Sequence, residues 1–339
     1  EAFVPAVYSN VLATPEVTQA TVVASYVSYG YEPNTVELNR ALIKSGKTLL
    51  LPRVNGDHID WIYWDGDESK LIEKKNILEP VGEVITQLPV IDVVIVPALR
   101  GFSSTTFLND DTPRTGQLAA LGRDLVDLMA ALGIRRPVLV GHDWGARAVA
   151  NACGLVADLA SHMVLLSVGY GTNNPSQSIS MEQARRYWYH WYMATPRGQA
   201  EVAANRRAFA QIMWDTWSPP GWYDAPTFSA AADAFDNPDW LPITLHSYQH
   251  RWAHAAGDPA YAADDAALAN PPQQAMPALL IHGGADGVSL LPDEKKALQY
   301  FTGYYAQRVI EGVGHFPQRE APDTVASLIL DFLASNPNC

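Results

Sequence analysis

Apolar and polar positions along the chain alternate in a rhythm that predicts strands followed by helices. Residues 21–30, 47–54 and 91–99 are apolar runs rich in β-branched side chains, which is typical of buried strands. Residues 35–46 carry apolar side chains at helical spacing and end at a glycine, which predicts a helix. The first hundred residues therefore follow a βαβ pattern.

Two features interrupt this pattern near the N-terminus. Residues 58–64 predict a short antiparallel strand, and the polar stretch at residues 65–75 predicts a loop. We expect the strand at residues 47–54 to stop near Pro52, because proline has no backbone N–H to donate to a neighbouring strand.

The alternation continues to the C-terminus with one long break. Residues 175–265 are crowded with Trp, Tyr and Arg and predict helices with irregular joints. We interpret them as a helical cap inserted into one α/β core that comprises residues 1–174 and 266–339. The predicted fold is α/β, with a mostly parallel sheet flanked by helices. The strand and helix segments that support it are residues 115–134, 136–155, 162–170, 276–287, 304–315 and 323–335.

Charge and cysteine content narrow the class of protein. The 339 residues carry a formal net charge of −13 without a basic cluster, which argues against nucleic acid or an anionic membrane as a partner. We expect no secretory leader and no membrane span, since residues 1–10 lack a basic segment and no apolar run reaches 18 residues. With only Cys153 and Cys339, we expect no structural disulfide and a cytoplasmic location.

The chemistry centres on Gly141-His142-Asp143-Trp144-Gly145, which follows a predicted strand and has the form G-x-nucleophile-x-G. This form predicts a sharp turn that places Asp143 at a helix N-terminus, where unpaired N–H groups stabilise negative charge. A carboxylate at the nucleophile position attacks a saturated carbon directly and forms an ester with the protein. Taken alone, however, the motif is weak, and a loop aspartate is more often a helix cap.

Hydrolysis of such an ester needs a base, and two later loops supply candidates. Asp286 and His315 each follow a predicted strand, in the order nucleophile, acid, histidine. Parallel strands end at one edge of a sheet, so we expect the three side chains to meet there. Asp286 would orient the ring of His315, which would activate water.

From about residue 94 onwards the chain resembles α/β-hydrolases of the epoxide hydrolase and haloalkane dehalogenase group. The resemblance rests on VIVPALRGFSST, VGHDWGARA, YWYHWYMATPRG, LHSYQHRW, LLIHGGADG and GVGHFPQREAP. It implies that Asp143 attacks an epoxide carbon, that two cap tyrosines, Tyr189 and Tyr248, donate to the epoxide oxygen, and that His315 activates water. Simple aromatic packing of the cap is the alternative for both tyrosines.

Four aromatic residues complete the expected site. Trp144 would line the pocket and offer its backbone N–H to the carbonyl oxygen of the nucleophile, with Trp188, Phe102 and Phe316 as further pocket walls. Such a lining predicts a mostly apolar substrate. We expect an epoxide and water as the small-molecule partners, no cofactor and no metal, and a homodimer as the oligomer to consider.

One element of this group is missing. An H-G-x-P turn, whose backbone N–H completes the oxyanion hole, does not precede Asp143. Instead, residues 6–99 resemble part of a 5-formyltetrahydrofolate cyclo-ligase, through ASYVSYGYEPNT, GKTLLLPRVNG, NILEP and IDVVIVPAL, with Glu32 matching a folate-contacting glutamate. The basic and glycine-rich phosphate-binding parts of that family are absent, so we expect no cyclo-ligase activity. The loop at residues 28–33 would replace the missing turn, because it also joins a strand to a helix, and the Arg100-Gly101 turn is a further candidate for the pocket wall.

We therefore expect an epoxide hydrolase. Haloalkane dehalogenation, which uses the same nucleophile and base, is the first alternative. A catalytically impaired scaffold is the second, because the loss of one oxyanion donor costs about 10²–10³ in rate.

Overall fold

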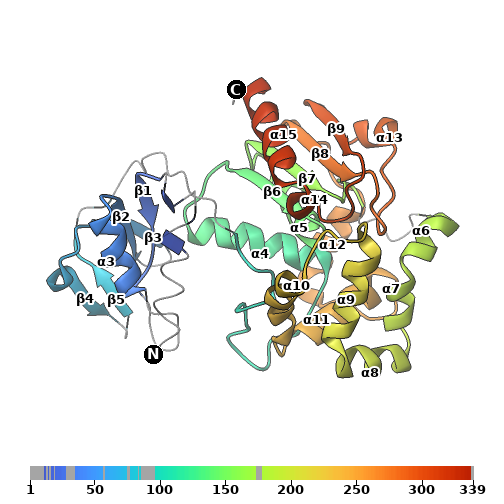
Figure 1. Cartoon of the computed structure of the whole chain (residues 1–339), viewed down its shortest axis with the longest axis horizontal. Helices are drawn as coiled ribbons and strands as arrows, with labels where there is room; N and C mark the ends of the chain where they lie inside the picture. The colour runs from blue at the N-terminus through green and yellow to red at the C-terminus, as the bar shows by residue number, and fades with distance from the viewer. Residues whose placement is uncertain are drawn as a thin grey trace. The chain divides into compact units, whose positions relative to one another are not determined.

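The computed structural model of the chain describes residues 11–12, 14, 17–18, 20–27, 35–55, 58–74, 77–82, 84, 96–172 and 178–336. It divides into two compact units, Glu1–Pro97 with Ala130–Gly133, and Ala98–Met129 with Ile134–Cys339. The two units are drawn in Figure 1 and are described separately below. No helix among the described residues is long and apolar enough to cross a bilayer.

The first unit contains a three-stranded sheet in the order β1-β2-β3 and a separate hairpin of β4 and β5. β1 runs parallel to β2, whereas β2 pairs with β3 in the antiparallel sense, as we predicted for residues 58–64. Helix α3 ends at Lys44, close to the predicted end. The φ of Gly46, two residues later, is 82°. The elements are β1 (Val22–Ala24), α3 (Val36–Lys44), β2 (Thr48–Asn55), β3 (His58–Trp64), η1 (Glu68–Lys70), β4 (Leu71–Lys74) and β5 (Ile77–Pro80).

Two predictions for this unit are wrong. β2 continues through Pro52 to Asn55, because β1 pairs with β2 only as far as Leu50 and leaves that side of Pro52 free of a described strand. A proline is tolerated at such an edge. The polar stretch after Asp65 is also not all loop, since η1 and β4 lie within it and β4 pairs with β5. Of the predicted strand at residues 91–99, positions 91–95 lie outside the described residues, and 96–99 are not in a strand.

The second unit contains a parallel sheet in the order β6-β7-β8-β9, with β6 (Val138–His142), β7 (His162–Leu166), β8 (Ala278–Gly283) and β9 (Tyr305–Ile310). Side chains of β7 point alternately to its two faces. Met163 and Leu165 pack in the cluster that includes α5 (Trp144–Leu155), whereas Val164 and Leu166 pack in the cluster that includes α15 (Pro322–Ser335). Helices on both faces of a parallel sheet confirm the predicted α/β class.

The long stretch between β7 and β8 is helical, and its helices α6 to α11 gather together in Figure 1. The helices of the second unit are α4 (Leu118–Ala131), α5, α6 (Met181–Arg186), α7 (Trp188–Met193), α8 (Pro196–Ala204), α9 (Arg206–Trp217), α10 (Ala225–Ala232), η2 (Asp233–Asp236), α11 (Trp240–Arg251), η3 (Pro259–Tyr261), α12 (Ala262–Ala269), α13 (Glu294–Leu298), α14 (Pro317–Glu320) and α15. Among the described residues, β1 to β5 pair with one another, and Ile62 of β3 also forms an isolated bridge with Val84. The domain limits at residues 174 and 265 stay predictions.

Candidate active site

The predicted nucleophile, Asp143, lies at a sharp turn between β6, which ends at His142, and α5, which begins at Trp144. Its φ of 47° and ψ of −110° are values that non-glycine residues rarely adopt. The strand and the helix approach closely, since a Cβ on Gly141 would lie 2.3 Å from the carbonyl oxygen of Gly145. The fold therefore requires a glycine at position 141. A Cβ on Gly145 would meet no atom within 4 Å outside the turn and its own helix, so space alone does not explain this glycine.

Three side chains lie in a line in the order Asp143, His315 and Asp286. Asp143 is the partly exposed one. Its Oδ2 lies 3.8 Å from Nε2 of His315, whose Nδ1 lies 2.9 Å from Oδ2 of Asp286. The side chain of Asp143 is 27% exposed, whereas those of His315 and Asp286 are 0% and 1% exposed. All three residues follow the carboxyl ends of parallel strands, β6, β9 and β8, where such sheets build their sites. Only the carboxylate of Asp143 is open to a small molecule.

Main-chain hydrogen bonds hold the position of His315. Its N–H lies 3.1 Å from the carbonyl oxygen of Trp217 and 2.9 Å from the hydroxyl of Ser218. Its carbonyl oxygen accepts from the hydroxyl of Ser167 at 2.9 Å and lies 2.7 Å from Nε2 of His142. Burial and then the charge of His315 lower the pKa of His142 to about 4, so His142 is neutral near pH 7 and donates its Nε2–H.

Asp286 is fixed as an anion in its loop. Its Oδ1 accepts hydrogen bonds from the backbone N–H of Val288 at 2.7 Å and of Ser289 at 2.9 Å. Burial raises the pKa of Asp286, but the charge of His315 and the hydrogen bond from its ring outweigh burial, and the pKa is lowered. The carboxylate therefore keeps a proton on Nδ1 of His315 and directs Nε2 towards Asp143.

His315 is a cation between two carboxylates in the free protein. Burial lowers its pKa, but the negative charges of Asp286 and Asp143 outweigh burial and raise the pKa to about 10. Burial likewise raises the pKa of Asp143, but the positive charge of His315 outweighs burial and holds the pKa well below its ordinary range. Both groups are thus ionised at neutral pH.

This ion pairing predicts a loss of stability at alkaline pH. Between pH 6.5, the ordinary pKa of histidine, and about 10, the folded state holds a proton on His315 that the unfolded chain releases. The free energy of unfolding should therefore fall as pH rises through this window, by at most about 1.4 kcal/mol per pH unit. Urea unfolding followed by tryptophan fluorescence would measure the fall. His315→Gln should remove it and the exposed control His254→Gln should retain it; a fall that persists unchanged in His315→Gln would contradict this assignment.

The two predicted tyrosines lie together, on α7 and α11. The rings of Tyr189 and Tyr248 are 5.4 Å apart at 88°, and the ring of Tyr248 is 5.5 Å from that of Trp144. Both tyrosines are buried. Burial and then the charge of Asp143 raise the pKa of Tyr248, and burial with Tyr248 raises the pKa of Tyr189. Both phenols therefore keep their protons at neutral pH and can donate them.

The predicted pocket walls fall into two groups. The ring of Phe102 lies 5.7 Å from that of Trp144, and the ring of Phe316 lies 5.3 Å from that of His315, so both contact the site. Trp188 differs, because it is 38% exposed and lines a separate surface pocket.

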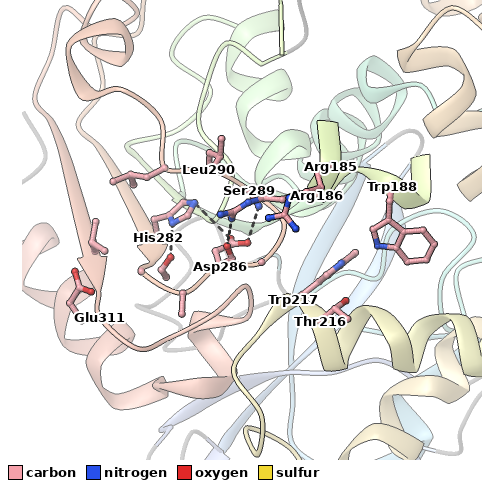
Figure 2. Close-up of a pocket in the computed structure, with 16 residues that line it drawn as sticks. Arg185, Arg186, Trp188, Thr216, Trp217, His282, Asp286, Ser289, Leu290 and Glu311 are labelled. Atoms are coloured by element: carbon pink, nitrogen blue, oxygen red, sulfur yellow. Dashed lines mark hydrogen bonds and ion pairs between the residues drawn. The ribbon is translucent and has the colours of Figure 1, made fainter. Parts of the chain in front are cut away.

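That surface pocket has a volume of about 750 Å³, and Asp286 is one of its lining residues (Figure 2). Figure 2 shows His282, Arg186 and Ser289 converging on Asp286, with Trp217 and Trp188 on the opposite wall. Asp143 and His315 are not among its lining residues. We therefore place the chemistry at the exposed face of Asp143 and not in this pocket.

One half of an oxyanion hole is present. Trp144 is the first residue of α5, so its backbone N–H has no partner within the helix. After the Arg100-Gly101 turn, the N–H of Phe102 donates to Leu99 and that of Ser103 donates to Ala234, which removes both as donors. The loop at residues 28–33 and Glu32 lie outside the described residues, as does Cys339.

Sequence reasoning missed several buried polar groups near Asp143. They are Arg147, His190, Trp217 and Arg251, and each has a buried N–H or ring nitrogen without a hydrogen-bond partner. Arg147 offered a signal, because it lies four residues after Asp143, in the first turn of the helix that follows this residue. The others come from distant segments and had no such signal.

Comparison with known proteins agrees with this geometry. Residues 93–322 match the α/β-hydrolase fold family, and residues 5–105 match the 5-formyltetrahydrofolate cyclo-ligase family. Epoxide hydrolase A of Mycobacterium tuberculosis is 28% identical over 263 residues, which cover 71% of this chain and 81% of that protein. The crystal structure of a candidate epoxide hydrolase from Klebsiella pneumoniae is 35% identical, with a TM-score of 0.66, and the match covers 70% of this chain and 79% of that one.

A third match shows that this fold alone does not specify the reaction. A candidate acyltransferase from Salmonella enterica is 21% identical, with a TM-score of 0.59, over 71% of this chain and 78% of that one. The same fold thus occurs in a protein named for other chemistry, and the site must decide the reaction. The nucleophile turn, the line of three side chains and the family match over residues 93–322 lead to one conclusion: the chain belongs to the α/β-hydrolase fold family.

Proposed function

We propose that this protein hydrolyses epoxides to vicinal diols through an ester on Asp143. The observation that carries the proposal is the pair of buried phenols, Tyr189 and Tyr248, packed against Trp144 at the nucleophile turn. An epoxide oxygen becomes a strongly basic alkoxide when the ring opens, so it needs a proton donor, which a leaving halide does not. Relatives named epoxide hydrolases support the same reaction.

In the first step an oxygen of Asp143 attacks an epoxide carbon. A new carbon–oxygen bond forms as the ring bond to oxygen breaks, and the electron pair stays on the ring oxygen. That oxygen takes the proton of Tyr248 or Tyr189, which leaves a tyrosinate and a hydroxyalkyl ester. The ester carries no charge, so one of the two carboxylates that hold His315 protonated is lost, and the proton of His315 can pass to the tyrosinate.

In the second step neutral His315 acts as the base. Its Nε2 takes a proton from water, and the hydroxide adds to the ester carbonyl carbon. Asp286 stabilises the imidazolium that forms. The intermediate collapses, the alkoxide leaves with the proton of the new carboxylic acid, and the diol is released. Asp143 keeps one oxygen from water, and every proton returns to its starting group.

The surrounding elements provide the setting for these steps. Helices α6 to α11 act as a cap in this proposal, since α7 and α11 carry the two tyrosines. Phe102, Trp144 and Phe316 line the site, whereas Trp188 lines the separate surface pocket. We place the protein in the cytoplasm, because Cys153 is a buried free cysteine. A homodimer stays a prediction.

Dehalogenation remains the second candidate because of one observation. The indole Nε1 of Trp217 is buried without a hydrogen-bond partner, and its ring lies 5.1 Å from that of His315. Such an N–H group could hold a departing halide.

A single pair of substrates separates the two candidates. Styrene oxide and bromobutane are offered to the protein, and diol and bromide are measured. We expect diol, and we expect Tyr248→Phe to slow its formation by about 10²-fold while any bromide release changes by less than about threefold. Tyr304→Phe, at a half-exposed tyrosine outside the site, is the matched control. Bromide without diol, or equal effects of Tyr248→Phe on both substrates, would contradict epoxide hydrolysis.

A further inference from the structure

Two arginines near the nucleophile lack an acidic partner. Arg147, on α5, is 7% exposed; its Nη1 donates to the hydroxyl of Thr172 at 2.7 Å, and its Nε is buried without a hydrogen-bond partner. Arg251, the last residue of α11, has Nε and Nη2 buried without a partner, and its guanidinium lies 5.3 Å from the ring centre of Tyr248. Among the described residues, no carboxylate lies within ion-pair distance of either arginine.

His190 adds a third donor to the same place. Its ring is 1% exposed and lies 4.2 Å from the ring of Tyr248. Nδ1 of His190 lies 3.1 Å from the indole Nε1 of Trp252, which can only donate, so Nδ1 accepts and the ring proton is on Nε2. That Nε2–H is buried without a partner.

The three groups share one electrostatic environment. Burial, followed by the charges of Arg251 and Arg147, lowers the pKa of His190 well below its ordinary value, so His190 is neutral. Burial and then Arg251 also lower the pKa of Arg147, and Asp143 acts on Arg147 in the opposite direction. Arg147, Arg251 and His190 therefore lie close enough to one another and to the nucleophile to interact.

The charges of the site do not balance. Arg147, Arg251 and protonated His315 are positive, and Asp143 and Asp286 are negative, which leaves one positive charge over. Burying an unpaired charge or an unmade hydrogen bond is costly, so such a cluster is expected to face an anion. Arginine is suited to that task, because its planar guanidinium donates two parallel hydrogen bonds to a carboxylate.

We propose that the substrate carries a carboxylate, which Arg147, Arg251 and the Nε2–H of His190 bind while Asp143 attacks the epoxide carbon. The backbone N–H of Arg147 donates to the carbonyl oxygen of Asp143 at 3.0 Å, so Arg147 lies one helical turn from Asp143 and the carboxylate is expected within a few bonds of the reacting carbon. The aromatic walls leave room for an apolar group at the other end. Short epoxy acids such as 3-phenylglycidate combine these features. This inference rests on the proposed epoxide hydrolysis and names its substrate class.

The test compares a charged and a neutral substrate on the same variants. Wild-type protein should open 3-phenylglycidate with a kcat/KM at least about tenfold above that for styrene oxide. Arg147→Met and Arg251→Met should each lower the ratio of kcat/KM for the glycidate to kcat/KM for styrene oxide by about 10- to 100-fold. The ratio removes any general effect on Tyr248, since both substrates need its proton. Arg197→Met, at an exposed arginine on α8, is the control.

A binding measurement keeps the test independent of turnover. Calorimetry with 3-phenylpropanoate, which has the carboxylate and no epoxide, should show affinity for wild type that falls about tenfold or more in each arginine variant. If Arg147→Met proves unstable, Arg147→Lys takes its place. Lysine retains the positive charge, so this variant should keep part of the affinity. Equal affinity in wild type and both methionine variants would overturn the anion site.

The outcomes separate this inference from the proposed function. If styrene oxide and glycidate are opened equally well and the arginine variants do not discriminate, the anion site is wrong and epoxide hydrolysis stands. If the protein instead releases chloride from chloroacetate in an arginine-dependent manner and opens no epoxide, the anion site stands and epoxide hydrolysis is wrong.

Discussion

The Asp143→Asn variant should lose epoxide-opening activity by at least about 10³-fold. An asparagine amide keeps the size and shape of the side chain. Its oxygen carries no negative charge, so it cannot attack the epoxide carbon to form the alkyl ester. The rest of the site would still bind the epoxide and donate a proton to it, so binding and residual solvent attack should survive. Diol formation from styrene oxide, measured by chromatography, checks the loss.

Labelled water sharpens this test of Asp143. In a single turnover in water enriched in oxygen-18, an ester mechanism leaves the heavy oxygen in the Asp143 carboxylate, while the first diol contains ordinary oxygen. Mass measurement of the peptide that contains Asp143 would detect the label. Asp127→Asn, at an exposed carboxylate on α4, is the matched control and should behave as wild type. Label in the first diol, or unchanged diol formation in Asp143→Asn, would refute the nucleophilic role.

The His315→Gln variant should still react once and then stop. Glutamine cannot take a proton from water, so the ester should form and persist, and turnover should fall by about 10³-fold or more. Intact mass would then show one equivalent of substrate added to the protein. The wild-type ester should not accumulate in the same way, because loss of the Asp143 charge frees His315 to act as a base.

Folding must be separated from chemistry for a residue as buried as His315. Its ring fills space between Trp217 and Phe316, so circular dichroism and urea unfolding should accompany the mass measurement. His254→Gln is the surface control, and Asp286→Asn is a second variant that leaves the ring in place and removes its orienting charge. A folded His315→Gln protein that consumes epoxide without any adduct would rule out His315 as the hydrolytic base.

The alkylation and hydrolysis steps depend on local patterns that can be read directly. The turn at Asp143 is encoded within five residues, because Gly141 alone permits the close approach of β6 and α5. The parallel order of strands then places Asp286 and His315 at the same edge, so their order along the chain was enough to predict the line of side chains. These predictions therefore depended on the local geometry of the turn and on the topology of parallel sheets.

Predictions failed where a neighbouring strand decided the outcome. Pro52 lies inside β2 because the pairing with β1 has already ended, and the stretch after Asp65 forms β4 because β5 is there to pair with it. A residue's preference for a strand depends on its partners, which a single sequence does not display.

The sequence by itself thus determined the α/β class and predicted which residues serve as nucleophile, acid and base. Only the tertiary structure showed that Arg147, Arg251 and His190 lie near Asp143 with no acidic partner among the described residues, and that Trp188 lines a different pocket. Charge balance in a buried site depends on which side chains from distant segments fail to find a partner. That failure has no local signature, because each arginine in the sequence looks like any other until burial and the neighbouring charges are known.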